Sequence, residues 1–112
     1  MAKSSVRSYS RYCLEAITLL SSLIRAARKA HGMTAKEVAD RAGISRGLLQ
    51  RIEKGDPKCE LGATLEVAAI VGVKLFDGEA ASLSEHIRHT EEKLALLPKT
   101  VRKKVKAADD DF

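Results

Sequence analysis

The sequence has no Trp and only two Tyr, two Phe, two Pro and two Cys among its 112 residues. With so few aromatic side chains, a core has to be built mainly from Leu, Ile, Val and Ala, and this composition favours packed helices. Cys13 and Cys59 are far apart and belong to no CxxC motif, so we expect reduced thiols rather than a disulfide framework or a zinc site. A chain of this length suits one compact domain with attached arms and leaves little room for a deep catalytic cleft.

Long apolar runs are also missing. No stretch approaches the roughly 18 apolar residues of a membrane span, and the N-terminus lacks the apolar segment of a signal peptide. We therefore expect a cytoplasmic protein without membrane contact. The sequence contains no phosphate-binding glycine loop and no nucleophile motif. His86 and His89 could share a metal with Glu92, but no further ligands cluster with them, so we expect no metal, no cofactor and no enzymatic activity.

Positive charge is what the sequence has in excess. It contains 20 Lys and Arg against 15 Asp and Glu, which gives a net charge of +5 and a pI near 9.4. An excess of this size favours polyanionic partners such as nucleic acid, although charge alone does not identify the partner.

Apolar periodicity and helix-end signals predict an all-α fold with five helices, at about residues 11–31, 35–42, 46–55, 61–71 and 82–97. Thr34 and Glu37 have the spacing of a capping box at the start of the second helix. Gly43 ends that helix and Ser45 caps the third. Two short helices joined by a tight glycine turn form the supersecondary unit that enters the major groove of DNA.

The same periodicity predicts which side chains form the core. The first helix presents one apolar face, made of Leu14, Ile17, Leu20, Ile24 and Ala27. The fourth helix is expected to place four residues on one face, Leu61, Leu65, Ala68 and Ala69. Further core residues are expected at Val38, Ile44, Leu49 and Ile52, with Val73, Leu75 and Phe76 closing over the core.

Four segments in the first half of the chain carry a more specific signal: LIRAAR at 23–28, MTAKEVA at 33–39, AGISR at 42–46 and RIEKG at 51–55. In this order they resemble the Cro and lambda-repressor-like (XRE) family. The resemblance implies a five-helix lambda-repressor-like helix-turn-helix fold, in which residues 11–78 are the DNA-binding domain and residues 79–98 supply the fifth helix. GDPK at 55–58, TLEVA at 64–68 and LFD at 75–77 resemble, more loosely, the HipB-like antitoxins that accompany HipA-like kinases.

The predicted third helix supplies the candidate base contacts, Ser45, Arg46, Gly47, Gln50 and Arg51. Arg can bind guanine and Gln can bind adenine, whereas Gly47 only lets the helix approach closely. A solvated helix face is the alternative for all of them. The candidate phosphate contacts are Arg28, Thr34, Lys36, Lys54 and Lys58.

Two further expectations come from the resemblance. It implies that Arg28 and Glu53 form an ion pair that fixes the reading helix. Many family members have a Gln where this chain has Ala35, so a side-chain contact to the DNA backbone is missing here.

The two ends of the chain are expected to differ from the domain. Residues 1–10 are predicted to form a flexible arm, and residues 99–112 a charged, disordered tail. The helix within residues 79–98 has an apolar stripe that either mediates dimerisation or packs on its own domain; the stripe consists of Leu83, Ile87, Leu94 and Leu97.

These features favour a sequence-specific repressor that binds double-stranded operator DNA as a homodimer. By resemblance, it would be the autoregulating antitoxin of a toxin-antitoxin pair with a HipA-like kinase as partner. Two alternatives stay open at this point: a partner-binding module with a degenerate helix-turn-helix, and a stand-alone transcriptional regulator.

Overall fold

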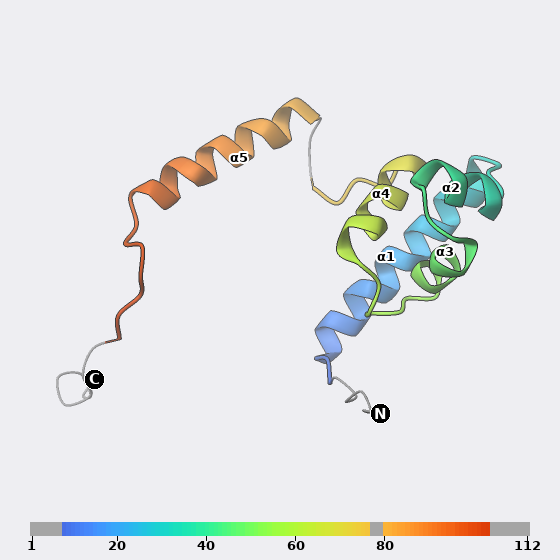
Figure 1. Ribbon diagram of the computed structural model, residues 1–112, viewed down its shortest axis with the longest axis horizontal. Helices are drawn as coiled ribbons and strands as arrows, with labels where there is room; N and C mark the ends of the chain where they lie inside the picture. Colours follow the sequence, from blue (N-terminus) through green and yellow to red (C-terminus); the bar gives the residue numbers. More distant parts are fainter. Residues whose placement is uncertain (1–7, 77–79, 104–112) are drawn as a thin grey trace. The chain divides into compact units, whose positions relative to one another are not determined.

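The computed structural model describes residues 8–76 and 80–103, and these ranges contain five helices and no strand. The helices are α1 (Arg11–Ala30), α2 (Ala35–Ala42), α3 (Arg46–Glu53), α4 (Leu61–Val71) and α5 (Ala80–Ala95) (Figure 1). The predicted all-α class with a long first helix is confirmed. The chain divides after Leu75 into two compact units, the first of which contains α1 to α4.

Hydroxyl side chains begin the first three helices. Ser10 accepts a hydrogen bond from the amide of Cys13 at 3.1 Å, and Ser45 accepts one from the amide of Leu48 at 3.0 Å. Thr34 and Glu37 form the predicted capping box at α2. Because the first amides of a helix have no partner inside it, these side chains fix where each helix starts.

Gly43 makes the turn between α2 and α3. Its φ of 70° lies in the left-handed region, which a residue without a Cβ adopts at little cost. The amide of Ile44 then donates to the carbonyl oxygen of Ala39 at 3.0 Å, so the last turn of α2 is closed by the chain that leads to α3. Ile44 itself is half-buried and packs against the core.

One core holds α1 to α4 together. Its largest fully buried side chains are Ile24, Val38, Leu49, Val67 and Val71, and each helix contributes at least one of them. Burial of one such side chain is worth roughly 1.5–3 kcal/mol. The expected burial of Ile24, Val38, Leu49 and Ile52 is confirmed.

Of the face predicted for α4, Ala68 is confirmed and the other three residues are wrong. Val67, Ala68 and Val71 point into the core, whereas Leu61 is 71% exposed, and Leu65 and Ala69 are also exposed. Apolar residues surround this helix on nearly all sides, so their spacing did not reveal which side is covered.

Two other core expectations also fail. Leu14 near the start of α1 is 42% exposed and lies outside the buried cluster. Leu75 and Phe76 are exposed because they stand where the first compact unit ends and the second begins, whereas Val73 does pack against the core.

The second unit contains α5, which begins and ends two residues earlier than the sequence predicted. Residues 99–103 are not helical. The predicted arm and tail fall mainly on residues 1–7 and 104–112, which lie outside the described residues. None of the described helices combines the length and the apolarity needed to cross a membrane.

Candidate nucleic-acid interface

Helix α3 has one buried side and one exposed side. Leu49, Ile52 and Glu53 are buried against the rest of the domain. The residues predicted to face base edges all lie on the exposed side: Ser45, Arg46, Gly47, Gln50 and Arg51. The helix is therefore oriented so that these residues can meet a ligand without unpacking the core.

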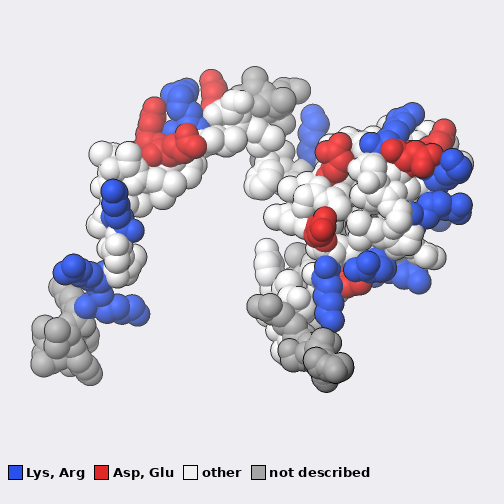
Figure 2. Space-filling view, viewed as in Figure 1, with Lys and Arg blue, Asp and Glu red and all other residues white. Residues whose placement is uncertain are grey.

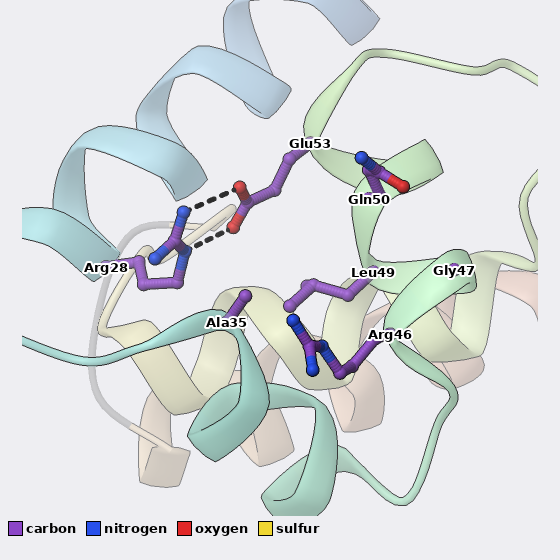
Figure 3. A pocket seen from close by; sticks show the side chains of 7 residues that line it. All are labelled: Arg28, Ala35, Arg46, Gly47, Leu49, Gln50 and Glu53. Atoms are coloured by element: carbon purple, nitrogen blue, oxygen red, sulfur yellow. Dashed lines mark hydrogen bonds and ion pairs between the residues drawn. The ribbon is translucent and has the colours of Figure 1, made fainter.

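A hollow of about 410 Å³ lies between the start of α2 and the exposed side of α3. Arg46, Gly47 and Gln50 line it from α3, and Ala35 lines it from α2. The side chain of Arg46 extends from α3 towards Ala35 (Figure 3). The small side chain at position 35 thus leaves room for the guanidinium group of Arg46.

Arg46 and Gln50 form no side-chain hydrogen bond or ion pair with other residues of the described ranges, so their polar groups are available to a ligand. A guanidinium group can donate two hydrogen bonds to guanine, and a carboxamide can both donate to and accept from adenine. These two side chains can read two different bases from one helix.

Arg51 differs from its neighbours because its guanidinium group is already engaged. Its Nε donates to a carboxylate oxygen of Asp56 at 3.0 Å, and this hydrogen bond raises the pKa of Arg51. The amide of Lys58 donates to the other oxygen of Asp56 at 2.8 Å. A base contact by Arg51 would have to share or break the ion pair with Asp56.

The structure brings Arg28 of α1 and Glu53 of α3 together in a two-pronged ion pair (Figure 3). Nε of Arg28 lies 2.6 Å from one carboxylate oxygen of Glu53, and Nη2 lies 3.0 Å from the other. The side chains are only 14% and 10% exposed, and the hydrogen bond to Glu53 raises the pKa of Arg28. Arg28 therefore stays charged throughout the physiological pH range.

Arg28 also donates from Nη1 to the carbonyl oxygen of Met33 at 3.1 Å, next to the N-cap of α2. Three of its N–H groups are thus used inside the protein. The predicted phosphate contact of Arg28 would have to use the remaining two.

Two further residues hold α3, and neither was expected from the sequence. Oγ of Ser21 donates to the carbonyl oxygen of Ile52 at 2.8 Å, and Nη1 of Arg25 donates to the carbonyl oxygen of Glu53 at 2.8 Å. Both carbonyls belong to the last turn of α3, where no intrahelical donor is present. Ser21 could have been noticed as a polar residue on the apolar face that contains Ile17 and Ile24.

The start of α2 is partly occupied by its own capping box. The amide of Thr34 donates to Glu37 at 2.8 Å, and the amide of Glu37 donates to Thr34 at 3.0 Å. A phosphate oxygen at this end would therefore be bound by the amides of Ala35 and Lys36. The carboxylate of Glu37 opposes an anion there, so charge from nearby Lys residues has to outweigh it.

Among the other phosphate candidates, Lys36 pairs with Asp40 at 3.0 Å on the surface. Lys54 and Lys58 are exposed and form no ion pair within the described residues. Figure 2 shows Lys and Arg side chains over the part of the domain that contains α2 and α3, with Asp and Glu among them. In the described part of the chain no group of three or more His, Cys, Asp and Glu side chains could hold a metal ion.

Comparison with known proteins agrees with this geometry. A family model described as helix-turn-helix matches residues 24–59, about a third of the chain. The matched segment runs from the core residue Ile24 through α2 and α3 to Cys59, and so contains every predicted base-contacting residue. No curated protein matches the chain. Residues 24–59 thus form a helix-turn-helix, and this match supports a DNA-binding transcription regulator.

Proposed function

We propose that the chain is a sequence-specific repressor that binds a two-fold operator as a homodimer, with α3 in the major groove. One observation carries the proposal: α3 exposes the unengaged side chains of Arg46 and Gln50, while four side-chain hydrogen bonds from α1 hold its opposite side. A reading helix has to be fixed in this way, because a helix that shifts by an ångström misplaces its donors relative to the bases.

Base reading and positioning are carried by different residues. Arg46 and Gln50 supply the sequence preference, and Gly47 between them keeps the backbone of α3 close to the groove floor. Lys36, Lys54 and Lys58, with the first amides of α2, hold the phosphates and add affinity for any sequence. A dimer that occupies a promoter excludes other proteins from the same grooves, so its effect is repression.

The antitoxin role rests on the looser likeness of residues 55–77 to HipB-like proteins. In that role the repressor acts on its own promoter and holds a HipA-like kinase. Co-purification with the product of the adjacent gene tests this role, and a neighbouring gene that encodes no kinase contradicts it.

A partner-binding module without operator specificity is the second candidate. Ala35 offers no side-chain contact to DNA, Glu37 places a negative charge at the start of α2, and Arg51 is engaged by Asp56. Each of these lowers the affinity for a phosphate backbone relative to a basic, unoccupied surface.

Binding to the chain's own upstream DNA and to scrambled DNA of equal length, at several salt concentrations, separates the candidates. A preference of about a thousandfold or more indicates a specific repressor. Equal, weak binding to both contradicts the proposal and favours the partner-binding module.

Substitution of Arg46 and of Lys54 tests the assigned roles. Arg46→Ala should lower operator affinity by roughly 1–3 kcal/mol and relax preference at one base position. Lys54→Ala, the control, should weaken binding to operator and to scrambled DNA equally. It should also reduce the slope of log affinity against log salt concentration by about one. Equal loss on both DNAs for Arg46→Ala would contradict its base-reading role.

A further inference from the structure

Helix α5 leaves a regular row of apolar side chains exposed. Leu83, Ile87 and Leu94 are 39%, 57% and 60% exposed, and Thr90 stands between the last two. Their spacings of four, three and four residues are the d-a-d-a pattern of a coiled coil, with Ile87 and Leu94 at a and Leu83 and Thr90 at d. We call these four residues the α5 seam. Figure 2 shows Lys, Arg, Asp and Glu side chains gathered along one edge of α5.

The surface along the α5 seam is hollowed. A depression of about 420 Å³ is lined by Leu83, His86, Ile87 and Thr90, with Phe76 and Glu91 beside them. The first four occupy positions i, i+3, i+4 and i+7 of the helix, which is the four-residue hole that receives one side chain of a facing helix in a coiled coil. Ile87 is one of the four residues that form this hole, and in a parallel, in-register pair the side chain that enters it is Ile87 of the second copy.

Thr90 is the one polar residue of the α5 seam, and its hydroxyl is already satisfied. Its Oγ1 donates to the carbonyl oxygen of His86 at 2.8 Å within the same helix. The side chain can therefore enter an apolar interface without leaving an unpaired donor.

We propose that the α5 seam pairs with the α5 seam of a second copy of the chain in a parallel, two-stranded coiled coil. This inference deepens the proposed function, since it supplies the interface of the homodimer. The seam is about two heptads long, so the dimer is weak in isolation and depends on protein concentration.

Residue types at the seam favour two parallel strands. Within parallel coiled coils, a β-branched residue such as Ile87 at a combined with Leu83 at d favours two strands. Flanking side chains favour the parallel direction. In a parallel pair an imidazole N–H of His86 at g can donate to Glu91 at e of the partner helix, whereas an antiparallel pair brings His86 towards the cationic Lys93 at g. The ion pair between Arg88 and Glu92 lies on other faces of the helix and stays in water.

Cross-linking of the full chain in the absence of DNA tests the direction of the pair. In a background of Cys13→Ser and Cys59→Ala, Leu83→Cys should form a covalent dimer at least tenfold faster than Glu85→Cys, a matched position on the outer face. An antiparallel pair places the two residues 83 about 16 Å apart along the axis, too far for a disulfide. Equal rates for the two variants would overturn the proposal.

Charge reversal provides a second test that retains the apolar seam. In a parallel pair, His86→Glu puts a carboxylate opposite Glu91 of the other chain and should weaken the dimer roughly tenfold in sedimentation equilibrium. The double variant His86→Glu/Glu91→Lys should restore it. In an antiparallel pair the new carboxylate meets Lys93, so unchanged or tighter association of His86→Glu would overturn the proposal.

Both measurements are separate from DNA reading. A dimeric chain that prefers operator over scrambled DNA, but in which Leu83→Cys and Glu85→Cys cross-link at equal rates, would contradict the coiled coil alone. A covalent Leu83→Cys dimer that binds both DNAs equally would contradict the proposed function alone.

Discussion

The two units of the chain place similar side chains in opposite environments. In the first unit Ile24 and Leu49 are less than 2% exposed, whereas in the second unit Ile87 and Leu94 are more than half exposed. The first unit has two Arg–Glu ion pairs, Arg11–Glu15 and Arg28–Glu53, and the described part of the second unit has one. The pair Arg28–Glu53 is nearly buried and joins two helices, while Arg88–Glu92 is more than half exposed and joins neighbouring turns of one helix.

This contrast shows what each unit needs to be stable. The first unit buries its own apolar residues and satisfies its own buried charges, so it has the contents of an independently folding domain. The second unit consists of one described helix with an uncovered apolar stripe, and such a helix gains most of its stability from packing against something else. Substitutions at equivalent groups should therefore have unequal effects in the two units.

The largest difference is expected between the two ion pairs. Glu53→Ala leaves the buried charge of Arg28 without a partner and should lower the free energy of unfolding of the domain by about 3 kcal/mol or more. Glu92→Ala should change it by less than about 0.5 kcal/mol, because an exposed pair is screened by water. Urea denaturation followed by circular dichroism measures both, and equal effects would remove the distinction between the units.

Leucine truncation should give the next largest difference. Leu49→Ala opens a cavity in the core and should destabilise the domain by roughly 2–5 kcal/mol. Leu83→Ala should change the free energy of unfolding of the domain by less than about 0.5 kcal/mol, as measured by thermal denaturation. It should instead weaken the association of the chain with a second copy. If Leu83→Ala destabilises the domain as much as Leu49→Ala, α5 is part of the core.

Hydroxyl removal should produce a smaller difference. Ser21→Ala removes the side-chain donor to the carbonyl oxygen of Ile52, which still accepts from the amide of Gly55 at 3.1 Å, and should cost about 1 kcal/mol. Thr90→Val, which removes an exposed hydroxyl of α5, should leave the stability of the domain unchanged. Urea titration measures the change in the free energy of unfolding for both variants. Equal changes would mean that a water molecule takes over the hydrogen bond of Ser21.

The smallest expected effect is a pH dependence confined to the first unit. Hydrogen bonds from the amide of Lys58 and the side chain of Arg51 hold the pKa of Asp56 below its ordinary value. The unfolded chain then binds more protons than the folded one, so this stabilisation is present near neutral pH and is lost as the pH falls below about 5. The urea midpoint of the unchanged chain should fall between pH 5 and pH 3, and Asp56→Asn should make this fall smaller. An equal fall in both proteins would contradict this role of Asp56.

Much of the first unit could be predicted from the sequence, because its helix ends carry local signals. Thr34, Glu37, Gly43 and Ser45 act within a few residues of themselves, so their roles can be inferred without tertiary structure. The exposure of Arg46 and Gln50 could be predicted because helical periodicity places them on a different side of the helix from the apolar residues Leu49 and Ile52.

The remaining features depend on contacts between distant residues. Which side of α4 is buried depends on where α1 and α2 lie, and an almost wholly apolar helix does not reveal this through its periodicity. The hydrogen bonds from Ser21 and Arg25 to the carbonyls of α3 join residues 31 and 28 positions apart. Every residue has a backbone carbonyl, so the sequence does not mark which of them accepts such a bond. The engagement of Arg51 by Asp56 likewise depends on the path of the loop after α3.

The hydrogen bonds that hold α3 all come from its rear, from Ser21, Arg25 and Arg28, whereas Arg46 and Gln50 stand on its front. Residues 46, 47 and 50 can therefore be exchanged without touching any group that keeps the helix in place. With the proposed function, this separation makes the domain a suitable frame for selecting new DNA sequence preferences from a library of variants. With that function, related chains can also diverge in the DNA they recognise while they keep the same fold and stability.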